Sequence, residues 1–152
     1  MTASFEHFVE LARTAVEAEA GLHADDRWWV LEPTLLVQRA RGGIEHVDLS
    51  EVLAHRPAGR ALLAGDLAGL ADALDVRRCA VAVHVDLELD GEIAPAIVLV
   101  AGGALVTACQ FARVERTDAG TPRLGPWEPS LDLEPQIGPA LRRKMTEGAR
   151  AP

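Results

Sequence analysis

The sequence has few cysteines and none of the common ligand pairs. Cys79 and Cys109 are the only two in 152 residues, too few for a disulfide framework. Both lie in apolar strand patterns, so we expect buried, reduced thiols in a cytoplasmic protein. The H-x-H, H-E-x-x-H and C-x-x-C pairs that anchor many metal sites are also missing. We therefore predict no metal centre and no cofactor.

Positive charge is scarce. Lys144 is the only lysine, and 15 basic residues face 23 acidic ones, which gives a formal net charge of −8. Nucleic acids and anionic membranes would repel such a chain, so neither is a predicted partner. The first ten residues, MTASFEHFVE, lack the basic and apolar stretches of a secretory signal. This absence also favours a cytoplasmic location.

One long run lacks charge altogether. Ile93 to Ala112 contains twenty uncharged residues, about the length of a membrane-spanning helix. Pro95 and the pair Gly102-Gly103 would break such a helix, and its many β-branched residues fit a sheet better. Mean hydropathy over the chain is only +0.09, and there is no second apolar run. We therefore predict two strands folded back at Gly102-Gly103.

The remaining patterns predict one α+β domain over residues 1–152. Its sheet should be mainly antiparallel, with about five strands in the order α-β-β-α-β-β-β-α. A strict alternation from Cys79 to Asp90, followed by the turn pair Asp90-Gly91, is the strongest strand signal. Five prolines between Pro122 and Pro139 exclude a central strand and predict an extended surface tail. The predicted helices span residues 4–20, 57–74 and 138–146, with one further turn capped by Ser50. The predicted strands span 34–41, 44–49, 79–90, 94–101 and 105–116.

This order of elements resembles that of the Roadblock/LC7 light-chain family and, more loosely, of other profilin-like and small chaperone folds. The resemblance lies in element order alone, and no residue motif accompanies it. It implies a dimerising adaptor rather than an enzyme.

One polar row suggests chemistry. His84, Asp86 and Glu88 alternate along the predicted strand 79–90, so their side chains project on the same side, roughly 6.6–7 Å apart. Neighbours in this row are close enough to orient an imidazole with a carboxylate or to share a metal. Polar alternation is also the ordinary pattern of a solvated antiparallel face, which is the interpretation we favour.

Three tryptophans are candidate binding residues. Trp28 and Trp29 follow the polar segment His23–Asp26, which is either a turn or the rim of a pocket with an aromatic floor. Trp127 is either a partner-binding anchor or a side chain that pins the proline-rich tail to the domain. Because tryptophan is usually packed, we favour the structural interpretation for all three.

The leading functional hypothesis is a non-catalytic interaction or regulatory module that acts as a homodimer, with a further protein partner open. It rests on Ala94–Ala101, which offers apolar side chains to both faces of the sheet. If the two long helices cover one face, the tail or a second subunit must cover the other. The alternatives are a small enzyme or ligand-binding protein that uses His84, Asp86 and Glu88, and an acidic chaperone.

Overall fold

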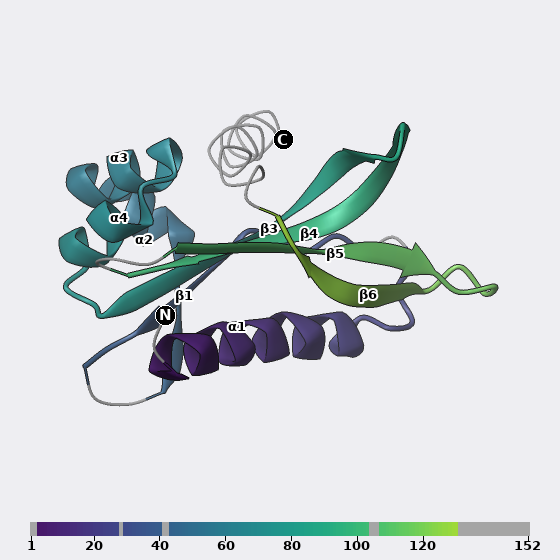
Figure 1. Cartoon of the computed structure of the whole chain (residues 1–152), viewed down its shortest axis with the longest axis horizontal. Coiled ribbons are helices and arrows are strands. Elements are labelled where there is room, and N and C mark those ends of the chain that lie inside the picture. The colour runs from purple at the N-terminus through teal and green to yellow at the C-terminus, as the bar shows by residue number, and fades with distance from the viewer. Residues whose placement is uncertain (1–2, 28, 41–42, 104–106, 131–152) are drawn as a thin grey trace.

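The structure, a computed structural model, describes residues 3–27, 29–40, 43–103 and 107–130. These residues form an α+β fold with helices on both sides of one antiparallel sheet (Figure 1). In chain order the elements are α1 (Ala3–Leu22), β1 (Thr34–Gln38), β2 (Ile44–Val47), α2 (Leu49–Ala54), α3 (Arg56–Ala64), α4 (Leu67–Ala73), β3 (Arg78–Leu89), β4 (Glu92–Gly102), β5 (Thr107–Arg116) and β6 (Pro122–Pro129).

The sheet has six strands in the order β2-β1-β3-β4-β5-β6, where about five were predicted. The additional strand is β6, which begins the proline-rich segment and pairs antiparallel with β5. Its place at the edge of the sheet explains why prolines are tolerated there, since one side of an edge strand needs no donors. The predicted tail beyond residue 130, with its short helix at 138–146, lies outside the described residues.

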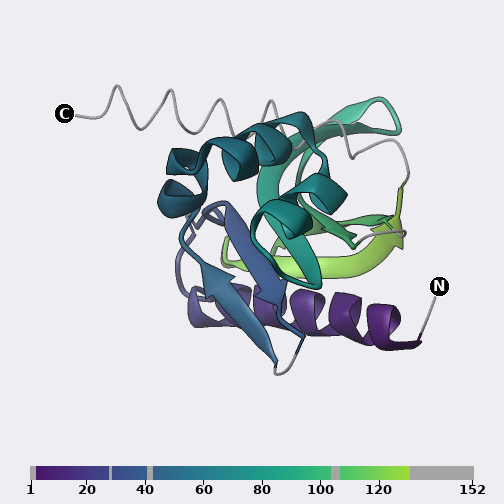
Figure 2. The same cartoon turned by 90° about the vertical axis from the view of Figure 1, so that its left-hand side faces the viewer.

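The helices are divided between the two faces of the sheet. Helix α1 packs on one face and α2, α3 and α4 pack on the other, as the perpendicular views show (Figures 1 and 2). The two-sided apolarity of β4 follows from this sandwich. Its side chains alternate between the cluster under α2–α4, with Ala96, Val98 and Val100, and the cluster under α1, with Ile97, Leu99 and Ala101.

The predicted long helix 57–74 is two helices, which is a correction to the sequence interpretation. Gly65 closes α3 with φ 74°, a left-handed conformation that glycine adopts without a Cβ clash. Asp66 then caps α4, because its Oδ1 accepts a hydrogen bond from the Gly69 amide at 2.9 Å. The short helix α2 is capped in the same way by Asp48, not by Ser50 as predicted.

Helix α4 lies very close to the sheet. A Cβ atom placed on Gly102 would come within 2.7 Å of the Leu67 Cβ atom. The absence of a side chain at Gly102 therefore lets the first turn of α4 rest on the end of β4. The neighbouring Cys79 thiol on β3 donates a hydrogen bond to the Leu67 carbonyl oxygen at 3.3 Å.

The uncharged run from Ile93 to Ala112 falls in β4 and β5, as predicted. These strands pair antiparallel from Ala96 opposite Arg113 to Gly102 opposite Thr107, and residues 104–106 between them lie outside the described residues. The predicted turn at Asp90-Gly91 is also confirmed, since φ is 53° and 82°, the positive pair of a type I′ hairpin. None of the described helices is long and apolar enough to cross a membrane.

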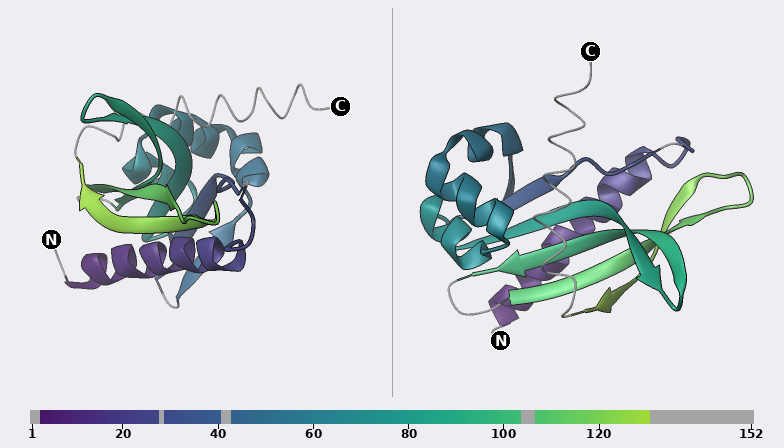
Figure 3. Two further views of the ribbon diagram at one scale, coloured as in Figure 1. Left: turned by 90° about the vertical axis from the view of Figure 1, so that its right-hand side faces the viewer. Right: turned by 90° about the horizontal axis from the view of Figure 1, so that it is seen from above.

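The β3–β4 and β5–β6 hairpins extend away from α2–α4 and diverge at that end of the sheet (Figures 1 and 3). Helix α1 runs toward the same end on its own face of the sheet. A connector, residues 23–33, then leads back to β1. At this end of the molecule the connector places Trp29 against both His23 and His84, whereas Asp86 and Glu88 lie farther along β3 toward the β3–β4 turn.

Candidate functional site

The row His84, Asp86 and Glu88 lies on β3, as predicted, on the face that α1 covers. His84 is half-buried, whereas Asp86 and Glu88 are exposed and stand opposite Pro95 and Ile93 of β4. The row therefore has two parts with different surroundings. One imidazole packs into the domain, and two carboxylates face solvent on the hairpin.

His84 holds the connector against the sheet. Its Nδ1 atom accepts a hydrogen bond from the Leu31 amide at 3.3 Å. The edge of the Trp29 ring meets the imidazole at 6.4 Å between centroids, with an angle of 66° between the planes. Because Nδ1 is used as an acceptor, this lone pair is occupied by the fold and is not available to a substrate.

Trp29 occupies the core and Trp127 joins two elements. Trp29 is 4% exposed and lies between His84 and His23, whose ring stacks on the indole at 6.1 Å and 17°. Trp127, on β6, donates from Nε1 to the Glu17 carboxylate of α1 at 2.9 Å. Trp28 lies outside the described residues. The indoles of Trp29 and Trp127 thus both make contacts within the domain.

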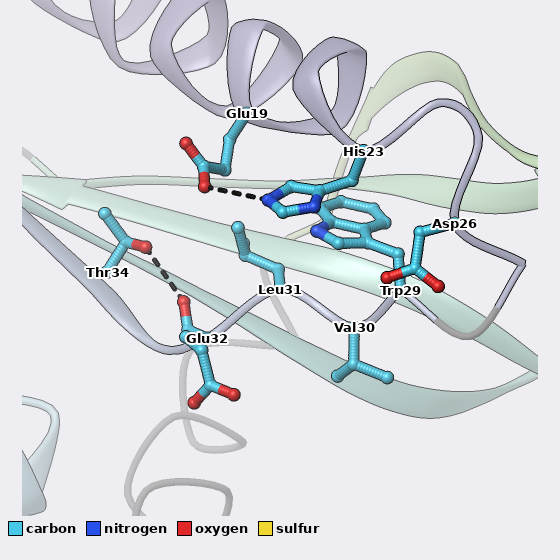
Figure 4. A pocket seen from close by; sticks show the side chains of 8 residues that line it. All are labelled: Glu19, His23, Asp26, Trp29, Val30, Leu31, Glu32 and Thr34. Carbon is cyan, nitrogen blue, oxygen red and sulfur yellow. Dashed lines mark hydrogen bonds and ion pairs between the residues drawn. The ribbon is translucent and has the colours of Figure 1, made fainter.

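A cavity of about 390 Å³ opens where α1 meets the connector. Figure 4 shows the His23 and Trp29 rings at its centre, with Glu19, Asp26 and Glu32 at separate places around them. Glu19 contacts the His23 ring at 3.4 Å. The size falls within the usual range of small-ligand sites, and the lining combines aromatic, apolar and acidic groups.

The sequence pointed to part of this cavity and missed the rest. His23, Asp26 and Trp29 belong to the segment for which a turn and a pocket rim were both considered, and residues 23–25 do form a turn. Glu19 and Glu32 were not recognised, because each follows the pattern of its own element. Their only signal was their position on either side of a segment that already held two acidic residues.

The formal charge of the chain is concentrated at this end. Residues 17–32 and 86–92 hold nine acidic residues and one basic residue, Arg27, whereas the rest of the chain holds fourteen of each sign. We call these two segments the acidic end. In the adjacent β5–β6 hairpin, acidic and basic residues are equal in number. Its Arg113 lies 3.7 Å from both Asp90 and Glu128. The net charge of −8 is therefore a local property of the acidic end.

Exposed apolar side chains occur in or directly beside the same two segments. Among the described residues, the large hydrophobic side chains that remain exposed are Leu22 at 80%, Ile93 at 76% and Val30 at 43%. Leu22 and Val30 belong to the acidic end, and Ile93 follows it directly. Single exposed apolar residues are common on protein surfaces, and each of these three has carboxylates close by in the sequence.

Metal-binding groups and reactive thiols are two kinds of site to consider among the described residues. These residues contain no group of three His, Cys, Asp or Glu side chains placed to hold a metal ion. Burial, with a smaller contribution from the charge of Asp66, raises the pKa of the Cys79 thiol to about 12. A thiol that stays protonated is a poor nucleophile, and Cys109 is also buried.

Comparisons with protein-family models, with curated proteins and with solved structures give no match to this chain. The similarity to Roadblock/LC7 light chains therefore remains one of element order, and the structure departs from that order by its divided second helix and its sixth strand.

Proposed function

We propose that this protein is a non-catalytic module that binds a basic partner protein through its acidic end. The observation that carries this proposal is the partition of charge, because the whole net charge of −8 comes from residues 17–32 and 86–92. Such a local field attracts positively charged surfaces and speeds their encounter. A surface of this sign also disfavours nucleic acids and anionic membranes as partners.

Exposed apolar groups support a protein as the partner. Leu22, Val30 and Ile93 give the acidic end side chains that a partner can bury, which adds affinity to the electrostatic attraction. Catalysis through His84, Asp86 and Glu88 receives less support, since Nδ1 of His84 already accepts the Leu31 amide. An acidic chaperone for a basic client would be one form of the proposed module.

The predicted homodimer receives no support from the faces of β4. It was inferred from the two apolar faces of β4, and these are covered within one chain by α1 on one side and α4 on the other. Two copies would also repel each other through their acidic ends. A homodimer and a cytoplasmic location therefore stay predictions from the sequence, and the proposed partner is a protein of opposite charge.

The test compares two variants of equal net charge. One replaces Asp86, Glu88 and Glu92 at the acidic end by their amides, and the other replaces the exposed Glu6, Asp72 and Asp118 elsewhere. The probe is a short synthetic peptide in which arginine and leucine alternate, and binding is followed by calorimetry. We expect the first variant to bind about tenfold more weakly, which corresponds to about 1.4 kcal/mol.

The control variant should bind within about twofold of the wild type. Equal losses in both variants would mean that the peptide senses net charge and not a surface, which would overturn the proposal. Absence of binding by the wild type at low ionic strength would overturn it as well, since electrostatic attraction is strongest there.

A further inference from the structure

We infer that the cavity between α1 and the connector receives one basic side chain of the partner, a lysine ammonium or an arginine guanidinium. The inference rests on the proposed function, because it names the group that the partner inserts. Three features of the cavity support it: the charge of its lining, the polarity of the helix that ends there, and its apolar walls.

Among the described residues, the lining carries carboxylates and no guanidinium or ammonium group. Glu19 comes from α1, whereas Asp26 and Glu32 come from the two ends of the connector. All three residues line the cavity, so a cation inside it would lie near negative charge from two elements of the fold (Figure 4). A carboxylate and a basic side chain form charge-assisted hydrogen bonds, which are stronger than neutral ones.

The end of α1 adds to this field. The last carbonyl groups of a long helix carry partial negative charge, which basic residues of the last turn often neutralise. Helix α1 spans 20 residues and has no basic residue in its last turn, which includes Glu19. The His23 ring contacts the Glu19 carboxylate at 3.4 Å. A partner cation would supply the charge that the helix itself lacks.

The cavity also suits the methylene stem of a basic residue. Val30 is 43% exposed at its wall, and Trp29 and Leu31 form the buried side beneath it. Lysine and arginine cover apolar surface with their stems while their charged groups stay among polar neighbours. A volume of about 390 Å³ is within the size range of sites for small ligands, so a single side chain can enter it.

The test uses small probes that contain only the inserted group. The amides of N-acetyl-arginine and N-acetyl-lysine are titrated into the protein, with the neutral citrulline analogue as control, while NMR follows the Trp29 indole and the Val30 methyl groups. We expect both cations to shift these signals and citrulline to leave them unchanged. Shifts of equal size with citrulline would overturn the inference, because charge would then not matter.

Paired variants separate this inference from the proposed function. The variant with Glu19→Gln and Glu32→Gln should bind the cationic amides at least about tenfold more weakly, whereas the matched variant with Glu6→Gln and Asp72→Asn, both exposed and outside the acidic end, should keep its affinity within about twofold. If the alternating peptide binds through Asp86 and Glu88 while the amides ignore Glu19 and Glu32, the cavity inference fails and the proposed function stands. If neither probe binds the wild type, both fail.

Discussion

The main-chain N–H of Leu31 donates to Nδ1 of His84 across 3.3 Å, between residues 53 positions apart in the chain. This contact ties the connector to the middle of β3. It also places Trp29 against the imidazole, so the aromatic floor of the cavity and His84 form one packed unit. The position of the cavity therefore depends on a histidine whose Nδ1 acts as a hydrogen-bond acceptor.

Replacement of His84 by alanine should lower the free energy of unfolding by about 1–3 kcal/mol. The Leu31 N–H would lose its partner, and a half-buried donor without an acceptor costs about this much. Asp86→Asn, two residues along the same strand face, is exposed and should change stability by no more than about 0.5 kcal/mol. Urea denaturation measures both. Equal stability of the two variants would show that the His84 contact contributes little.

Replacement by alanine should change stability in opposite directions at Gly65, which caps α3, and at Gly21, which lies within α1. Gly65→Ala should cost about 1–2 kcal/mol, because Gly65 has φ 74° and a Cβ atom is disfavoured there. Gly21→Ala should stabilise the protein by up to about 1 kcal/mol, because Gly21 lies within α1 and a Cβ atom there meets nothing within 4 Å. Thermal unfolding of the two variants checks the prediction, and a shift of the same sign in both would contradict it.

Gly102→Ala should destabilise the protein by about 1–3 kcal/mol, because the new Cβ atom would come within 2.7 Å of the Leu67 Cβ atom. Leu67→Ala alone removes a buried side chain and should cost about 2–5 kcal/mol. Leu67→Ala keeps a Cβ atom but removes the rest of the side chain, so α4 can shift. The double variant should therefore lose less than the sum of the single losses in a double-mutant cycle. Strict additivity would mean that the two residues do not share this contact.

The Cys79 thiol should be protected from alkylation by the fold. Burial raises its pKa from the ordinary 9.0 to about 12, so the folded protein contains very little thiolate at pH 8. Iodoacetamide labelling, read by mass spectrometry of the Cys79 peptide, should be slow in buffer and fast in urea. Rapid labelling of the folded protein would contradict this.

The same shift gives a pH dependence of stability. The unfolded thiol ionises near its ordinary pKa of 9.0, whereas the folded thiol resists ionisation up to about 12. The contribution of Cys79 is therefore fully present below about pH 9 and is lost progressively as the pH rises toward 12. Urea unfolding between these limits should show a shallower decline for Cys79→Ala than for the wild type.

Much of the fold could be predicted because apolar and polar residues alternate along a half-buried strand. The alternation from Cys79 to Asp90 predicted β3 and the side chains on each of its faces. The pair Asp90-Gly91 predicted the tight turn in which both residues have positive φ values. Both faces of β4 are buried. The uncharged run predicted this strand, but it did not predict which elements pack on its two faces. The structure alone places α1 and α4 on opposite sides.

The errors arose where one residue has two roles. Gly65 lies inside the range 57–74 that was predicted as one long helix, yet its left-handed conformation ends α3. The prolines of β6 argued against a strand, yet they suit an edge that donates on one side only. At the site, the cluster at His23 was visible in the sequence. The contributions of Glu19 and Glu32 to the cavity depend on how the connector packs against α1, which no local sequence pattern reveals.

The hydrogen bond from Trp127 to Glu17 has a consequence for biosynthesis. It joins the first helix to the last described strand, over a separation of 110 residues. While the chain emerges from the ribosome, α1 is synthesised first, and this contact can form only after β6 has been synthesised. A nascent chain arrested before residue 122 would leave Trp127 and its neighbours on β6 unmade and the adjoining flank of α1 open to water. Completion of the domain is thus tied to the end of translation of β6.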